Sequence, residues 1–97
     1  MEPYLISGFV SLIEQVHDKL TFLTIDSVEI EERQRIPFYS PVSIRAYFGR
    51  VVDISLKVTE GAFPTIEQEI CSSDHRDMIV LSKQEVEDII LKYRTKR

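Results

Sequence analysis

Apolar and polar residues alternate along Pro41–Gly49, and the rest of the chain is interpreted around this stretch. Within PVSIRAYFG the apolar side chains occupy every second position, namely Val42, Ile44, Ala46 and Phe48. A period of two is typical of a strand with one face in a core and the other in solvent. The pattern therefore predicts a central strand that carries Ser43, Arg45 and Tyr47 on its solvent face.

Two strands are predicted before it, at Tyr4–Ile13 and Leu20–Ile30. Both segments are rich in β-branched and aromatic residues, which favour strands over helices. The polar segment Glu14–Lys19 lies between them and predicts a turn, so the two strands form an antiparallel hairpin. Gly8 is expected to mark a bulge or a bend in the first strand.

The segment Glu31–Pro41 contains two prolines and a cluster of mixed charges, which predicts a protruding loop. It places Phe38 and Tyr39 beside Arg33 and Arg35, a combination that suits base stacking. The alternative is that Phe38 lies in the core beneath the loop.

The segment Gly49–Gly61 carries two competing patterns. Apolar residues recur at helical spacing at Val51, Ile54 and Val58, whereas Val52 and Leu56 fit an alternating pattern. We predict a short helix here. Two more strands, at Ala62–Ile70 and Met78–Leu81, are expected to follow, joined by the polar turn Cys71–Asp77.

The last segment carries the signals of a helix. Ser82-Lys83-Gln84-Glu85 matches the capping box that begins helices. An apolar stripe follows at helical spacing, formed by Val86, Ile89, Ile90 and Tyr93. The sequence therefore predicts a helix over residues 83–94. Its stripe must pack either on the chain's own barrel or against another chain, and we expect the second, an interface.

Five short strands with one helix between the third and the fourth are the pattern of the OB-fold, a small Greek-key barrel. We therefore predict a mainly β fold in one domain of 97 residues. The predicted five-stranded barrel spans residues 4–81, with a short helix between strands 3 and 4, and the C-terminal α-helix spans 83–94.

The run IRAYFGRVVDISLKVTEGAFPTIEQEI resembles the centre of bacterial single-stranded DNA-binding proteins and their PriB relatives. In that family a strand ends in an aromatic–glycine pair, here Phe48-Gly49, and a charged residue with glycine, here Glu60-Gly61, precedes the next barrel strand. The resemblance implies an OB-fold that binds single-stranded DNA. The chain departs from the family because it has no tryptophan and carries Gln68 where the fourth strand usually has glycine.

The capped helix at the end of a barrel also resembles the small subunit of replication protein A and the small subunits of telomere-binding complexes. That resemblance implies that the helix packs against a partner subunit.

The charge distribution leaves two interpretations open. A net charge of −4 argues against a plain nucleic-acid binder. Between residues 33 and 57, however, five basic residues face only Asp53; they are Arg33, Arg35, Arg45, Arg50 and Lys57. Such a local cluster can bind phosphates, or these arginines can pair with nearby acids such as Glu29, Glu31 and Glu32.

No catalytic constellation is recognisable, so we expect no enzyme and no cofactor. The single cysteine, Cys71, allows no disulfide within the chain, and with His17 and His75 it predicts no metal site. We expect neither a membrane-spanning segment nor a signal peptide, because no apolar run is long enough to span a membrane and MEPYLISGF lacks the basic residues and long apolar segment of a signal peptide. We expect a cytoplasmic or nucleoid-associated protein, or one in another reducing compartment.

These observations predict a non-enzymatic protein that binds single-stranded DNA or RNA, as a homo-oligomer or as a subunit of a complex. Bases would stack on Tyr39 and Tyr47, while phosphates would contact Arg33, Arg35, Arg45 and Arg50. The alternative is a protein–protein interaction module in a larger complex. A third hypothesis is a viral or plasmid-encoded protein that binds a host factor.

Overall fold

The computed structural model describes residues 4–27, 29, 31–39 and 44–95. Its elements are β1 (Tyr4–His17), β2 (Leu20–Ser27), β3 (Arg33–Phe38), the 3-10 turn η1 (Arg45–Tyr47), β4 (Val51–Val58), β5 (Thr65–Cys71), β6 (Arg76–Ser82) and α1 (Lys83–Thr95). The strands form one antiparallel sheet in the order β3-β2-β1-β4-β5-β6. The mainly β class and the terminal helix are thus confirmed. Barrel closure is not found in this part of the chain, where six strands form an open sheet with β3 and β6 at its edges.

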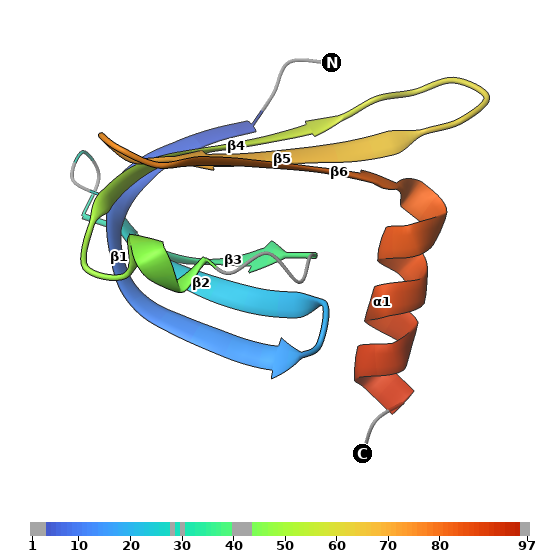
Figure 1. The fold of residues 1–97 in the computed structure, drawn as a ribbon, viewed down its shortest axis with the longest axis horizontal. Coiled ribbons are helices and arrows are strands. Elements are labelled where there is room, and N and C mark those ends of the chain that lie inside the picture. The colour runs from blue at the N-terminus through green and yellow to red at the C-terminus, as the bar shows by residue number, and fades with distance from the viewer. Residues whose placement is uncertain (1–3, 28, 30, 40–43, 96–97) are drawn as a thin grey trace.

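The sheet curls because β1 belongs to two halves of it. Residues 4–9 of β1 pair with β4, and residues 8–17 pair with β2. Figure 1 shows β1 bending between the layer of β4, β5 and β6 and the layer of β2 and β3. Gly8 lies where both partners meet β1, and a Cβ there would lie 2.5 Å from the carbonyl oxygen of Asp26. The register shifts of β1 occur beyond Gly8, between Val10 and Leu12 and between Gln15 and His17.

The core fills the space between the two layers. It is made by inward-facing residues of β1, β2, β4, β5 and β6, together with Phe38, Ile44 and Tyr47. The buried side chain of Gln68 on β5 crosses to the end of β3. Its Nε2 donates to the carbonyl of Pro37 at 2.6 Å, and its Oε1 accepts from the N–H of Tyr39 at 3.1 Å. Gln68 therefore links the two layers where their backbones do not pair.

The prediction of a loop over Glu31–Pro41 is wrong for residues 33–38, which form β3. Proline is compatible with this strand because β3 is at the edge of the sheet, where a missing N–H breaks no ladder bond. Phe38 is buried in the core, which confirms the alternative that we left open for it. Residues 40–43 lie outside the described part of the chain.

The short helix predicted within Gly49–Gly61 is also wrong, because residues 51–58 form β4. This strand pairs on both sides, with β1 and with β5. Val52 and Ile54 are buried at alternate positions and point into the core. Pairing with two distant strands decides between the competing patterns, and that pairing cannot be recognised locally.

The helix α1 is confirmed, with the Ser82 hydroxyl accepting from the Glu85 N–H at 3.1 Å as the predicted cap. The proposed interface stripe, however, is largely used within the chain. Val86 and Ile89 are buried, Ile90 is half-buried, and the Tyr93 ring lies 6.4 Å from the ring of Phe22 on β2. Figure 1 shows α1 standing across one end of the curled sheet. Val86 and Ile89 therefore stabilise the monomer and are not available to another chain.

We expect Ile89→Ala to lower the free energy of unfolding by about 2–5 kcal/mol, because it leaves a cavity between α1 and the sheet. Leu91→Ala on the exposed side of the same helix is the matched control and should change stability by less than about 0.5 kcal/mol. Urea denaturation followed by circular dichroism measures both. A stable Ile89→Ala variant with an altered oligomeric state would instead place the stripe in an interface.

Candidate functional site

The segment before β4 is a 3-10 turn rather than the predicted central strand. Residues three apart share a face in a 3-10 helix, so Ile44 and Tyr47 both point inward and are buried. Arg45 and Phe48 point outward and are exposed, Phe48 at 59%. The prediction that Tyr47 lies on the solvent face is therefore wrong, since its side chain is 0% exposed. Residues 41–43 of the predicted strand lie outside the described residues.

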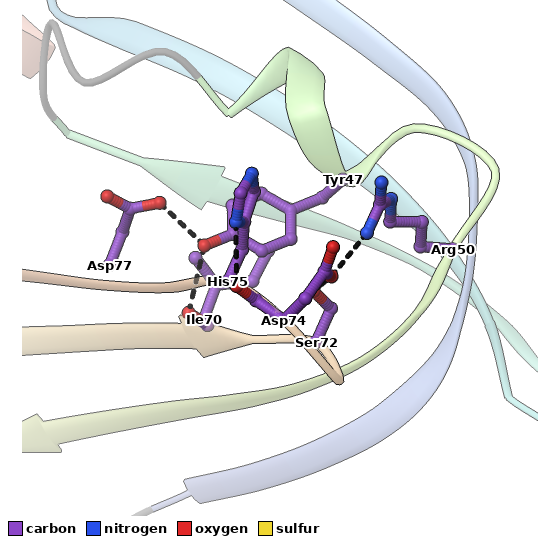
Figure 2. Close-up of polar contacts among 7 residues, drawn as sticks. All are labelled: Tyr47, Arg50, Ile70, Ser72, Asp74, His75 and Asp77. Carbon is purple, nitrogen blue, oxygen red and sulfur yellow. Dashed lines mark hydrogen bonds and ion pairs between the residues drawn. The ribbon is translucent and has the colours of Figure 1, made fainter.

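Tyr47 fastens η1 to the opposite layer. Figure 2 shows its hydroxyl reaching Asp77 on β6, to which it donates at 2.5 Å, with the carbonyl oxygen of Ile70 at 3.4 Å. The ring of His75 meets the Tyr47 ring edge-on, at 6.2 Å between centroids. Burial and the hydrogen bond to the Asp77 carboxylate raise the pKa of Tyr47 well above its usual range. Tyr47 is thus a structural anchor and cannot stack on a base in this conformation.

Arg50 is held at the turn between β5 and β6. Its guanidinium pairs with the carboxylate of Asp74, which also accepts from the hydroxyl of Ser72 (Figure 2). Desolvation opposes ionisation of Asp74, but the Ser72 hydrogen bond and the Arg50 charge outweigh it, so the pKa of Asp74 is lowered. The positive charge of Arg50 is therefore already paired with the carboxylate of Asp74.

The arginines of β3 are paired as well. Arg33 forms a salt bridge with Asp26 at 2.7 Å, and Arg35 forms one with Glu14 at 3.2 Å. The guanidinium of Arg35 also lies 3.6 Å from the centre of the Phe22 ring. The interpretation that these arginines pair with acids is correct, although the acids differ from those we named. Exposed ion pairs of this kind are worth at most about 1 kcal/mol, but they lower the net positive charge offered to a phosphate.

The predicted nucleic-acid residues come from different elements. Arg33 and Arg35 lie on β3, Arg45 lies on η1, and Arg50 follows η1 with its guanidinium at the turn after β5. Tyr39 is half-buried; its backbone N–H is used by Gln68, and burial raises the pKa of its hydroxyl. Among the predicted residues, Arg45 alone lines the groove described next.

A shallow groove of about 390 Å³ lies between β1 and η1. It is lined by Leu12, Ile13, Gln15, Arg45 and Phe48. Phe48 and Arg45 supply an exposed aromatic ring and a cation from one turn of chain. No ion pair involves Arg45 among the residues that the structure describes.

A β-bulge in β1 creates the apolar side of this groove. The pairing with β2 shifts between Val10 and Leu12, so Leu12 no longer points to the core as alternation from Val10 would require. Leu12 is 47% exposed, while Ile13 packs against the core in its place. The sequence pattern missed Leu12 and Phe48, because both hold positions that belong to the core face of a regular strand.

Other kinds of site find no support in the described ranges. No three side chains among His, Cys, Asp and Glu come together there in a way that could hold a metal ion. No described helix has the length and apolar character needed to cross a membrane. Comparison of the chain with protein-family models, with curated proteins and with solved structures gave no match.

The raised pKa of Tyr47 predicts a loss of stability in alkali. Above about pH 10 the unfolded chain releases the Tyr47 proton while the folded chain keeps it, so rising pH favours unfolding. The slope for this group is at most about 1.4 kcal/mol per pH unit. We expect Tyr47→Phe to be less stable at neutral pH by about 1–3 kcal/mol, because Asp77 loses its donor.

The stability difference between the wild type and Tyr47→Phe should therefore shrink as the pH rises from about 8 to about 11. Chemical denaturation at several pH values measures it. Tyr93→Phe, which removes a hydroxyl but keeps the partly exposed ring beside Phe22, is the control. Parallel curves for the wild type and Tyr47→Phe would show that the hydroxyl is not buried in the folded chain.

Proposed function

We propose that this protein is a non-enzymatic interaction module that binds a segment of a partner protein in the groove between β1 and η1. The partner segment carries an apolar side chain beside a carboxylate. The observation that carries this proposal is the exposure of Leu12 and Phe48 around a groove whose cation, Arg45, has no acidic partner among the described residues.

Apolar exposure continues from the groove along the neighbouring strands. Phe9 on β1 and Val51 on β4 are paired directly across the sheet, and both are exposed. Exposed apolar side chains that cluster, rather than occur singly, are typical of interaction surfaces. A ring in a concave surface also suits an anchor contact, since aromatic residues contribute much of the energy at protein interfaces.

Charge defines the chemistry of the partner. The protein has a net charge of −4, and the other arginines of the central region pair with acids of the chain. Among the described residues Arg45 has no such acid, so its guanidinium in the groove can receive a negative group. A single cation beside apolar side chains suits one carboxylate better than a run of phosphates, which requires several cations in line.

The architecture supports a binding role of this type. We infer that the curled sheet is an OB-fold-like, partly open barrel in which the Gln68 amide stands in for a closing strand pair. OB-folds are used as binding modules for extended ligands. In this protein the groove is lined by the exposed side chains of Leu12 and Phe48, so a ligand can bind to them without opening the core.

The proposal predicts binding of an acidic–aromatic peptide. Nitrogen-15 NMR spectra would be recorded during titration with a short peptide that has one Phe flanked by glutamates. We expect shifts at Leu12, Gln15, Arg45 and Phe48 that saturate at millimolar peptide or below. A peptide with lysines in place of the glutamates should bind more weakly, because it is repelled by Arg45.

Phe48→Ala should weaken this binding at least about tenfold, which is a modest loss for an aromatic anchor. Phe63→Ala is the matched control, because Phe63 is also exposed but lies in the loop between β4 and β5. Absence of shifts at millimolar acidic–aromatic peptide, or equal losses in both variants, contradicts the proposal.

Single-stranded nucleic acid is the second candidate ligand, and one observation favours it. Arg45 and Phe48 on one short turn could hold a phosphate and stack a base. An oligothymidine titration by fluorescence anisotropy at low salt tests it. We expect at most weak binding, with a slope of about −0.7 in log affinity against log salt for a single phosphate contact. Tight binding with a much steeper slope would establish the nucleic-acid function instead.

A further inference from the structure

The two edges of the sheet differ in how they are protected. On β3, Pro37 has no N–H to offer, its carbonyl accepts from Gln68, and the N–H of the adjoining Tyr39 donates to Gln68. Arg33 and Arg35 add charge along the same strand. Proline, charge and covered backbone groups are the means by which proteins prevent edge strands from pairing with other chains. The β3 edge is therefore blocked.

The β6 edge has none of these protections at its centre. Residues 78–81 read Met-Ile-Val-Leu, with no proline, glycine or charge. Met78 and Val80 are exposed on the outer face, while Ile79 on the opposite face is buried. No strand pairs beyond β6 in the described part of the chain. An edge strand of seven residues with an apolar centre, paired on one side only among the described strands, is a ready site for strand addition.

We propose that β6 pairs antiparallel with β6 of a second copy of this chain, which continues the sheet across a two-fold axis. Ile79 lies on the axis, because that register uses all seven residues of the strand. Met78 then faces the partner's Val80, and Arg76 faces the partner's Ser82. Two-fold pairing of this kind is isologous, so each strand satisfies the edge of the other.

The sequence of β6 argues for a second copy as the occupant. In this register, Met78 and Val80 of both copies form one apolar cluster on the outer face, Asp77 faces the partner's Leu81, and no two like charges are opposite each other. A register shifted by two residues in either direction would leave only five residues of each strand paired. The strand is thus complementary to itself in one arrangement.

Charge substitution at the edge tests the pairing. Sedimentation equilibrium of the full chain should show a concentration-dependent dimer. Val80→Lys should raise its dissociation constant at least about tenfold, because each dimer carries the substitution twice and lysine protects edge strands. Met78→Glu should act in the same direction, so a folding failure of one variant does not decide the result.

Ser55→Lys is the matched control. Ser55 is half-buried on the outer face of the same layer, but it belongs to β4 and is paired on both sides, with Leu5 of β1 and Glu69 of β5. Edge pairing leaves the Ser55→Lys dimer intact. A monomeric wild type, or a dimer lost in Ser55→Lys and kept in Val80→Lys, overturns the proposal; the second result would indicate face-to-face stacking of sheets.

Disulfide trapping tests the register in a Cys71→Ser background. A Met78→Cys protein mixed with a Val80→Cys protein should form the mixed disulfide under mild oxidation, because directly opposite residues lie within bonding distance. Met78→Cys alone should cross-link poorly, since diagonal positions are about 7–8 Å apart, beyond the usual disulfide span. Cross-linking of Met78→Cys with itself at equal yield overturns the register. Retention of peptide binding by Val80→Lys separates this edge from the groove.

Discussion

The fold depends on the sharp curl of β1, and the curl depends on the close approach of two strands at Gly8. Strand β1 changes partner there, from β4 to β2, and the carbonyl oxygen of Asp26 lies where a Cβ would be. Any larger residue would force β2 away from β1 and open the angle between the two layers. The inward-facing residues of both layers could then no longer share one core.

Polar links across the open side maintain the curl. Tyr4 donates to Gln34 at 2.9 Å, Gln68 joins β5 to the end of β3, and Tyr47 reaches Asp77 from η1. Each link joins the β2–β3 layer or η1 to elements of the other layer. The links made by Gln68 and Tyr47 use buried side chains. Breaking either link would leave a buried polar atom without a partner, which costs free energy. A small domain that lacks closure by strand pairing thus holds its shape through side chains.

The sequence predicted those parts of the fold that depend on local pattern. The first two strands, the last two strands and the capped helix α1 were recognisable because alternation, turn residues and the cap all occur within a few residues. Residues 33–38 and 51–58 were predicted wrongly, because both segments depend on distant partners. A strand containing Pro37 is tolerated only because β3 is at the edge of the sheet, and residues 51–58 form a strand rather than a helix because they pair with β1 and β5. The burial of Tyr47 was missed for a different reason. Positions 44, 46 and 48 alternate, but the backbone there has a period of three.

The exposed site is a consequence of how the interior is filled. Tyr47 occupies the space between the layers, and the three-residue period of η1 then leaves Phe48 outside. On β1, the bulge after Val10 turns Leu12 away from the core, and Ile13 packs against the core in its place. Two departures from regular structure, on two different elements, therefore turn apolar side chains towards the same groove. A regular strand at either place would bury its side chain in the core, so the irregularities that defeated the sequence pattern are also the ones that build the candidate site.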